Sequence, residues 1–262
     1  MSDEKKVLLI LVDGLRPEAI SLCGHPYLEK MAAAGTSCLQ ARTVMPCVTL
    51  PSHTSLFMSV PPERHGVLTN NWTPMARPIP SLTDVVHQAG KTTAMFYNWE
   101  ELRDLSRPGS LDFSYFKKMS EVHKQTLADE REMTERVIAH LSAQAPDFTF
   151  LYYGWPDEAG HHFGWLGKKY LQSVAQVSEM VEQIAAGLDA RYQVILCADH
   201  GGHGRNHGEN VAEDMRIPLL CQGSAFPAGK KLAQASIMDI APTIARILGI
   251  APPALWEGEC LV

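Results

Sequence analysis

Three aspartates stand where strongly apolar stretches of this sequence end. They are Asp13 after residues 7–12, Asp157 after residues 148–153 and Asp199 after residues 192–198. Carboxylates that lie close together repel one another, so they take up protons unless a cation neutralises them. If the three stretches are neighbouring strands, the sequence therefore predicts a cation site built on these aspartates.

Histidines cluster near the aspartates in glycine- and proline-rich segments. The nearest are His161, four residues after Asp157; His200, directly after Asp199; and His203 and His207 in GGHGRNHGE. Aspartate and histidine together suit zinc or manganese better than calcium or magnesium. Three aspartates and three histidines are enough to hold two divalent metal ions. Such a pair can clamp the attacking and leaving oxygens of a phosphoryl displacement.

The candidate nucleophile is Thr49, in the segment PCVTLPSHTSLFMSV. Pro51 suits the first turn of a helix, so we expect Thr49 to lie just before a helix N-terminus. Backbone N–H groups and the helix dipole favour an anion there. A threonine hydroxyl attacks only when a base or metal activates it, and a metal held by Asp13, Asp199 and His200 would do so. The alternative is that Thr49 merely caps the helix.

Polar and aromatic side chains after this helix offer further contacts to a substrate. The segment HGVLTNNW holds two asparagines, and an asparagine amide can donate to a phosphoryl oxygen as charge develops. Chemistry alone does not choose between Asn70 and Asn71. A nucleobase or another planar group could stack on an aromatic ring, and the candidates are Trp72, Tyr97, Trp99 and Trp155.

The segments around these residues alternate between strand-like and helix-like patterns, which predicts a largely parallel sheet covered by helices. Strands are expected at residues 7–12, 92–97, 148–153, 192–198 and 217–221. Helices are expected at residues 81–90, 120–143, 168–188 and 237–248. Ligands of open α/β sheets bind at the carboxyl ends of the strands. Parallel strands would therefore bring the three aspartates to one edge of the sheet.

Four motifs of this sequence resemble the nucleotide pyrophosphatase/phosphodiesterase branch of the alkaline phosphatase superfamily. They are LLILVDGLRPE, VTLPSHTSLFMSVPPERHGVLTNNW, YGWPDEAGHHFGW and CADHGGHGRNHGE. The segment SIMDIAPTIARILGIAPP is also similar to the end of that superfamily's core. The resemblance implies an α/β fold, the alkaline-phosphatase-like three-layer sandwich, with a largely parallel central sheet and helices on both faces. Residues 1–262 would form a single catalytic domain, with either a small lid or a plain loop within residues 71–109.

The resemblance also implies a role for each site residue. One metal ion would be held by Asp13, Asp199 and His200, with the oxygen of Thr49 beside it. The second metal ion would be held by Asp157, His161 and His207, although His203 stays an alternative for the last ligand. Asn70 would contact a phosphoryl oxygen. The metal ions would be two zinc ions, with manganese as the alternative, and the mechanism would pass through a covalent phospho-threonine.

The expected substrate is a small phosphate ester, with a nucleotide as one candidate, cleaved at a phosphodiester or pyrophosphate bond. Alternatives are a phosphomonoesterase or phosphonate hydrolase on the same metal core, and a non-catalytic metal-binding module. A monoester carries more charge and would benefit from a cationic clamp. Four cations lie near the motifs, and we expect each to be a solvated surface charge: Arg16, Arg64, Arg77 and Lys91.

Bulk properties narrow the class of protein further. The net charge of −6 argues against stable binding to nucleic acid. The apolar run in MSDEKKVLLILVDG is too short for a signal peptide core or a membrane span, so we expect a cytoplasmic protein without membrane contact. The six cysteines form no CxxC pair, which favours free buried thiols in a reducing compartment.

Overall fold

The first apolar run forms β1 (Lys6–Val12), a strand in the middle of the sheet whose seven residues are all buried. The structure is a computed structural model that describes residues 4–107, 109–119 and 123–262. Among these residues, seven strands form one sheet in the order β2-β7-β6-β1-β5-β3-β4. The other strands are β2 (Thr36–Arg42), β3 (Thr93–Tyr97), β4 (Phe113–Phe116), β5 (Phe148–Tyr153), β6 (Tyr192–Cys197) and β7 (Arg216–Gln222).

The sheet is largely parallel, as predicted. Both neighbours of β1, the strands β5 and β6, run parallel to it. The strand expected at residues 217–221 is present as β7, but it pairs antiparallel with both β6 and β2. Strands β2 and β4 were not predicted, because neither has a long run of aliphatic residues. The direction of β7 could not be predicted either, because an apolar run has the same pattern in a parallel and in an antiparallel strand.

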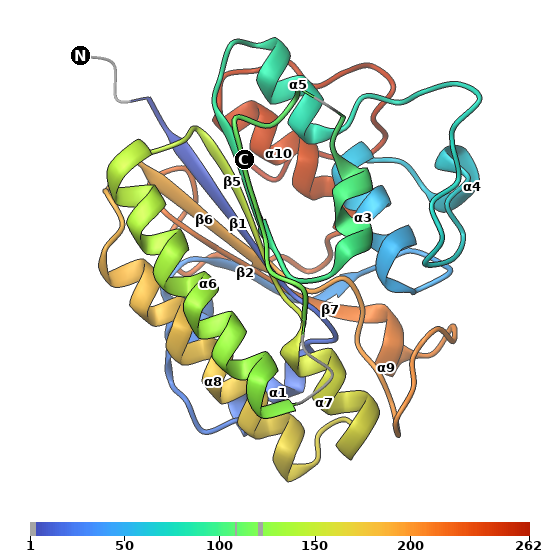
Figure 1. Ribbon diagram of the computed structural model, residues 1–262, viewed down its shortest axis with the longest axis vertical. Helices are drawn as coiled ribbons and strands as arrows, with labels where there is room; N and C mark the ends of the chain where they lie inside the picture. The colour runs from blue at the N-terminus through green and yellow to red at the C-terminus, as the bar shows by residue number, and fades with distance from the viewer. Residues whose placement is uncertain (1–3, 108, 120–122) are drawn as a thin grey trace.

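Helices cover both faces of the sheet and give a three-layer α/β fold (Figure 1). One face carries α1 (Pro17–Leu22), α2 (Tyr27–Ala34), α6 (His123–Gln144) and α8 (Lys168–Ala186). The other face carries α3 (Thr49–Met58), α5 (Leu82–Gln88) and α10 (Ile240–Ile247). The shorter helices are α4 (Pro62–His65), α7 (Trp155–Phe163), α9 (Ala212–Met215), η1 (Glu100–Leu105) and η2 (Ile237–Asp239).

Most predicted helices are present with small changes at their ends. The capping box of Ser81 and Asp84 begins α5, as its sequence indicates. The helix expected at 237–248 is split into η2 and α10, and the beginning of the helix expected at 120–143 lies outside the described residues. All six cysteines are free, but Cys23 is only half-buried and Cys260 is exposed, so the expectation of buried thiols is wrong for these two.

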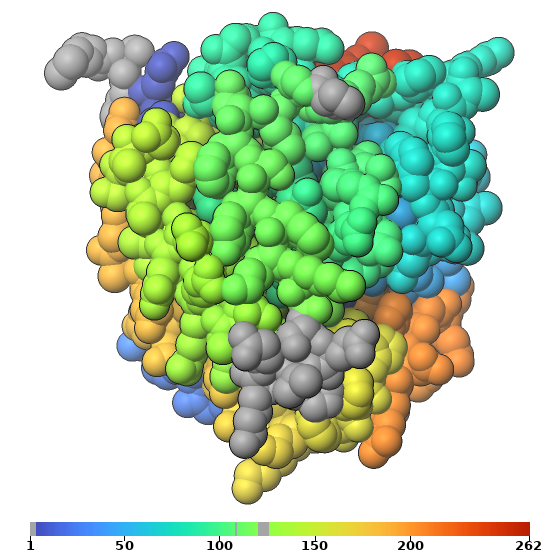
Figure 2. Space-filling view, in the orientation of Figure 1, coloured from blue at the N-terminus to red at the C-terminus, as the bar shows by residue number. Residues whose placement is uncertain are grey.

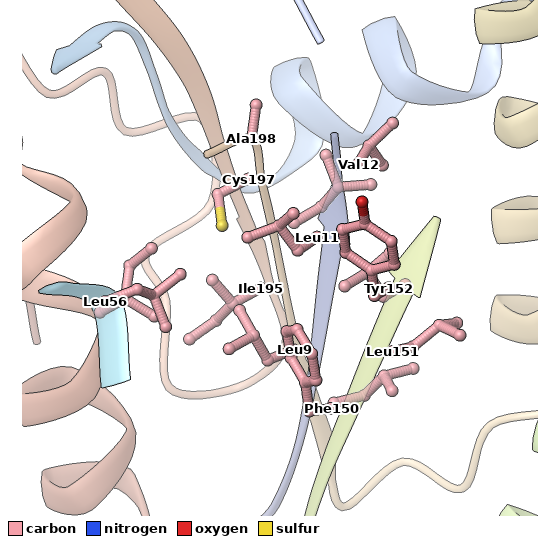
Figure 3. Close-up of a cluster of buried hydrophobic side chains, with 14 of the residues drawn as sticks. Leu9, Leu11, Val12, Leu56, Phe150, Leu151, Tyr152, Ile195, Cys197 and Ala198 are labelled. Carbon is pink, nitrogen blue, oxygen red and sulfur yellow. The ribbon is translucent and has the colours of Figure 1, made fainter. Parts of the chain in front are cut away.

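The core between the sheet and α3 is built from matching rows of side chains. Leu9 is in register with Phe150 on one side and with Ile195 on the other. Figure 3 shows Leu9 and Ile195 on the side of the sheet that faces Leu56 of α3, whereas Leu151 points away. These four side chains are fully or almost fully buried. The row fixes the depth at which α3 lies against the strands.

The same alternation carries two of the predicted site residues toward α3. Leu11 is in register with Cys197, one row nearer the carboxyl end of the strands. Asp13 and Asp199 each follow by two residues, and a strand repeats its facing every two residues. Both carboxylates therefore lie on the α3 side of the sheet, directly beyond an apolar core.

A lid or a plain loop was expected within residues 71–109, of which the structure describes residues 71–107 and 109. They contain α5 and β3, and β3 is part of the central sheet. Movement of any part of this range over the site stays a prediction, as does the single catalytic domain. Within the described part of the chain, no helix has the length and apolar character needed to cross a membrane.

Candidate active site

Backbone and carboxylate groups join the ends of the three central strands. The N–H of Asp13 donates to the carbonyl of Tyr153 (2.9 Å). The N–H of Gly14 donates to Oδ1 of Asp199 (3.2 Å). Gly14 has a φ of +65°, which favours glycine, and a Cβ there would approach Asp157 to 3.1 Å. The three predicted aspartates therefore converge at one edge of the sheet, as their strands indicated.

His200 lies at the centre of the first group of predicted residues. Its Nε2 is 3.1 Å from Oδ2 of Asp199 and 3.4 Å from Oδ1 of Asp13. The same nitrogen is 3.3 Å from Oγ1 of Thr49. All four side chains are buried. The proposed nucleophile and three proposed metal ligands are thus within direct reach of one another.

The second group is assembled by α7 and the loop after β6. Asp157 and His161 lie one turn apart on α7, with His161 Nε2 3.4 Å from Asp157 Oδ2. His207 Nε2 is 3.9 Å from Asp157 Oδ1. The ring of His207 also stacks on that of His200, with 3.7 Å between ring centroids. The two groups are therefore adjacent halves of one site.

Two overlapping sets of side chains could each hold a metal ion. One set is Asp157, His161 and His207, and the other is Asp13, Asp157 and His200. Within each set, one ligand atom per residue lies within 4.8 Å of the others. The resemblance assigns Asp157 to the second ion alone, whereas Asp157 belongs to both of these candidate sets. Asp199 belongs to neither set, but its Oδ2 lies 3.1 Å from Nε2 of His200.

The histidines present the right nitrogen for metal binding. Nδ1 of His161, His200 and His207 lies 3.0, 2.8 and 3.1 Å, respectively, from a backbone carbonyl oxygen. A carbonyl oxygen only accepts, so Nδ1 of each ring carries the proton. The lone pair of a neutral ring is then on Nε2, which points into the site. Metal-binding histidines are commonly oriented by such a hydrogen bond from the second nitrogen.

The carboxylates also fit a cationic ligand. Asp13 Oδ1, Asp157 Oδ1 and Asp199 Oδ2 are buried and have no hydrogen-bond partner among the described residues. Burial, followed by the charge of neighbouring aspartates, raises the pKa of Asp13 and of Asp157 well above the ordinary value. Burial raises the pKa of Asp199 to about 7. Divalent cations would satisfy these oxygens and stabilise their ionised form.

Thr49 is the first residue of α3, so the expectation that it precedes the helix is corrected by one position. Its N–H has no carbonyl partner within the helix, because the first helical donors have none. The next donor, the N–H of Leu50, is bound by Oδ1 of Asn70 (2.9 Å). This contact leaves the Asn70 amide nitrogen as a donor beside Thr49. Asn71 is exposed and does not line the pocket.

These groups face a pocket of about 200 Å³. In the space-filling view, α7 (yellow) and residues 200–215 (orange), which contribute to the pocket, lie side by side at the lower part of the molecule (Figure 2). Its described lining contains no lysine or arginine. The lining residues are Asp13, Thr49, Asn70, Trp99, Met119, Tyr152, Gly154, Asp157, Glu158, His161 and His207.

Two other candidates from the sequence lie outside the pocket. His203 belongs to neither metal-binding set, because its Nδ1 is 2.7 Å from Oδ1 of Asp214. Arg16 is buried, which corrects the expectation of a surface charge, and it holds Glu18 and the carbonyl of Gly202. Of the aromatic candidates, Trp99 lines the pocket.

Sequence reasoning missed three side chains that support the site. The hydroxyl of Tyr152 donates to Asp13 Oδ2. The indole N–H of Trp165 donates to the carbonyl of Gly14 (2.9 Å), and Glu130 contacts the beginning of α7. Tyr152 was visible as part of an apolar strand, where a buried hydroxyl needs a partner. The contacts of Trp165 and Glu130 are tertiary and left no local signal.

The family model for type I phosphodiesterase/nucleotide pyrophosphatase matches residues 7–217, most of the chain. The chain belongs to this family. The matched range includes every residue of both metal-binding sets. Family membership agrees with the four motifs described above and with the order in which they occur.

Several curated members of the family are similar to this chain. Ectonucleotide pyrophosphatase/phosphodiesterase family member 1 of Rattus norvegicus is 27% identical over 218 residues, 74% of this chain and 24% of the relative. The bis(5'-adenosyl)-triphosphatase ENPP4 of Bos taurus is 26% identical over 223 residues, 75% of this chain and 47% of the relative. The chain thus spans about a quarter to a half of the length of these relatives.

Solved structures confirm the fold. Murine ectonucleotide pyrophosphatase/phosphodiesterase 5, in an inactive form with AMP, has a TM-score of 0.79 at 16% identity and covers 98% of both chains. The phosphonate monoester hydrolase of Agrobacterium radiobacter has a TM-score of 0.76 at 17% identity and covers 98% of this chain and 76% of that chain. At such identities the likeness shows the alkaline-phosphatase-like fold alone.

Proposed function

We propose that this protein is a metal-dependent hydrolase of phosphodiester or pyrophosphate bonds that uses Thr49 as nucleophile. The observation that carries the proposal is the position of Thr49. Its hydroxyl lies at the beginning of α3, in the pocket, and 3.3 Å from His200 Nε2. Family membership supports the reaction type. A murine relative is described as inactive when one threonine is replaced by alanine, which fits a threonine nucleophile.

Two divalent metal ions, zinc or manganese, would bind in the pocket. The first would be held by Asp13, Asp199 and His200, and the second by Asp157, His161 and His207. These cations would supply the positive charge that favours an ionised Thr49 oxygen, an ionised water and the charge on the phosphoryl oxygens. The unpartnered carboxylate oxygens and the free Nε2 atoms support this assignment.

In the first chemical step, Thr49 Oγ1 gives up its proton and attacks phosphorus. A bond forms between Oγ1 and phosphorus, and the bond from phosphorus to the leaving oxygen breaks. The leaving oxygen takes up a proton and departs as an alcohol or a phosphate. The N–H of Thr49 and the side-chain amide of Asn70 would donate to an equatorial phosphoryl oxygen as its charge develops.

In the second step, water attacks the phospho-threonine. A new bond forms between the water oxygen and phosphorus, the bond to Oγ1 breaks, and Thr49 regains its proton. One water is consumed, and a phosphate monoester is released. The site is suited to this step because Thr49 shares one pocket with Asp157 and His207, two residues that would hold the second metal ion.

The side chains that line the pocket favour a diester substrate over a monoester. The described lining contains no cationic side chain, and Glu158 adds a carboxylate to it. A monoester carries up to two negative charges where a diester carries one, so it would depend more on a cationic side-chain clamp beside the metal ions, and the described lining offers none. Trp99 lines the pocket and is the candidate for stacking a planar leaving group. Nucleotides are therefore natural candidates, and the names of the murine and bovine relatives include AMP and a diadenosine triphosphate activity.

The test compares hydrolysis of bis-p-nitrophenyl phosphate with that of p-nitrophenyl phosphate by metal-analysed protein, with and without a chelator. We expect chelator-sensitive turnover with the diester preferred. Preference for the monoester would move the function to a phosphatase on the same site. A protein that hydrolyses neither compound with two metal ions bound would contradict the proposal for simple esters.

A further inference from the structure

Helix α7 carries two of the proposed metal ligands but cannot cap its own N-terminus. Its N-cap residue is Gly154, which has no side chain that could accept a hydrogen bond from the first helical N–H groups. A Cβ at this position would come within 3.2 Å of Tyr152 and 3.3 Å of Met119, both in the pocket wall, so a larger residue would require these side chains to shift. The first helical donors must therefore be satisfied from elsewhere in the chain.

Glu130 of α6 supplies the missing cap. Its Oε1 accepts the N–H of Gly154 and the N–H of Trp155, both at 2.8 Å. The side chain is fully buried. An acceptor oxygen at a helix N-terminus satisfies the free N–H groups whether or not its carboxyl group is ionised. The contact lies at the beginning of α7, within one turn of Asp157 and less than two turns from His161.

The same oxygen also holds the opposite wall of the pocket. Glu130 Oε1 accepts from Nδ2 of Asn98 (3.1 Å), and Asn98 is itself buried. The carbonyl of Asn98 accepts the N–H of Met119 (2.9 Å), and the residue after Asn98 is Trp99. Both Trp99 and Met119 line the pocket. One carboxylate is thus connected to the metal-binding helix and to the wall that would contact the leaving group.

We propose that Glu130 is a positioning residue, whose buried carboxylate keeps the metal-binding end of α7 aligned with the Trp99 wall of the pocket. The inference rests on the metal site of the proposed function. It requires Glu130 to act as a hydrogen-bond acceptor, because its contacts are N–H donors on α7 and on Asn98. Residues that orient metal ligands from outside the coordination sphere commonly change metal affinity by about 10- to 100-fold when they are removed.

The experiment measures Zn²⁺ affinity of metal-stripped protein by competition with a chromophoric chelator, in the absence of substrate. Glu130→Ala should weaken one of the two Zn²⁺ positions by at least about tenfold. Glu130→Gln keeps an acceptor oxygen for the two α7 donors, so its affinity should stay within about threefold of wild type. The control is Thr134→Val, one turn along α6, which loses hydrogen bonds to Tyr153 and to the backbone carbonyl of Glu130 but leaves the Glu130 side chain and its contacts with α7 in place.

A second variant separates the two contacts of the carboxylate. Asn98→Ala removes the link to the Trp99 wall and leaves the cap of α7 in place. It should bind Zn²⁺ as wild type does and raise KM for bis-p-nitrophenyl phosphate several-fold, with kcat little changed. A role in overall stability alone would not divide the effects in this way.

Three outcomes would overturn the role of Glu130. They are wild-type Zn²⁺ affinity in folded Glu130→Ala, equal losses in folded Glu130→Gln and Glu130→Ala, and an equal loss in Thr134→Val. If Glu130→Ala does not fold, Glu130→Gln and Asn98→Ala still decide the question. A wild-type protein that binds two Zn²⁺ ions but cleaves no phosphodiester would contradict the proposed function and leave the test of Glu130 intact.

Discussion

The hydrogen bonds of the proposed histidine ligands determine which ring nitrogen each one offers to a metal ion. Each proposed histidine ligand donates Nδ1–H to a backbone carbonyl, which leaves Nε2 for a metal ion. Burial and the neighbouring His200 lower the pKa of His207 to about 3, so this ring is neutral. A neutral imidazole is the form that binds a metal. By contrast, each of the three aspartates has one buried carboxylate oxygen that finds no hydrogen-bond partner in the part of the chain that the structure describes.

Replacing Thr49 tests the nucleophile directly. Thr49→Ala removes the attacking oxygen but leaves the proposed ligands in place, so turnover should fall by about 1,000-fold or more. Metal content and thermal midpoint should stay near wild type. Thr49→Ser restores a hydroxyl and should recover part of the activity in the same assay. Substantial turnover by Thr49→Ala would show that another group attacks phosphorus.

Variants of two histidines in the same loop test which of them is the last metal ligand. His207→Ala should lose about one metal ion per chain and most of the activity, because Nε2 of His207 faces Asp157. His203→Ala should keep both ions, since that ring is bound to Asp214 outside the site. Metal analysis after dialysis distinguishes the two. Loss of metal from His203→Ala alone would reverse the assignment.

At the scale of elements, the site depends on close packing between α7 and the loop after β6. Trp165 fills the space between them, and two glycines allow its ring to approach. A Cβ would lie 2.6 Å from the ring at Gly160 and 2.2 Å at Gly202. The indole is also held by the carbonyl of Gly14, which joins this packing to the end of β1.

Adding a methyl group at Gly202 should therefore disturb both packing and metal binding. Gly202→Ala forces Trp165 to move, and overpacking of this kind costs about 1–3 kcal/mol. We expect a lower thermal midpoint and weaker Zn²⁺ binding, because His200 precedes this turn. The control is Gly187→Ala at the end of α8, where the nearest atom would be 3.8 Å away. Equal behaviour of the two variants would contradict this account of Trp165.

At the scale of the whole molecule, buried carboxylates make the stability of the metal-free protein depend on pH. The pKa values of Asp199 and Glu130 are raised by burial to about 7 and about 8. Between about pH 6.5 and pH 8 the folded state therefore binds more protons than the unfolded state. Its stability must fall as pH rises through this window. His53 and His207, with a pKa lowered to about 3, act in the opposite sense only below about pH 6.5.

The expected result is a thermal midpoint of metal-free protein that decreases from pH 6.5 to pH 8. Bound Zn²⁺ holds the carboxylates ionised, so the increase in midpoint on adding Zn²⁺ should grow over the same range. Differential scanning calorimetry at several pH values checks both trends. Asp199→Asn, which removes one of the groups, should flatten the metal-free curve. A midpoint that rises with pH in wild type would contradict the assignment.

Much of this arrangement was readable from the sequence, because it follows local rules. The aliphatic runs predicted β1, β5 and β6, and the strand-end rule predicted that Asp13 and Asp199 would meet. Other features depend on tertiary contacts that leave no local pattern. Glu130 lies in an ordinary charged helix, and only the folded chain brings it to Gly154. The same holds for β2, whose mixed composition gave no strand signal.

Strand β1 lies between β5 and β6, and both of these strands follow it far along the chain. Val7 pairs with Phe148 and Lys6 pairs with Tyr192, so both neighbours of this apolar strand are synthesised long after it. Until they emerge from the ribosome, KVLLILV is an uncovered, aggregation-prone segment. Pairings so distant in sequence also slow folding. The nascent chain should therefore need chaperone protection, and the yield of refolding from denaturant should fall as protein concentration rises.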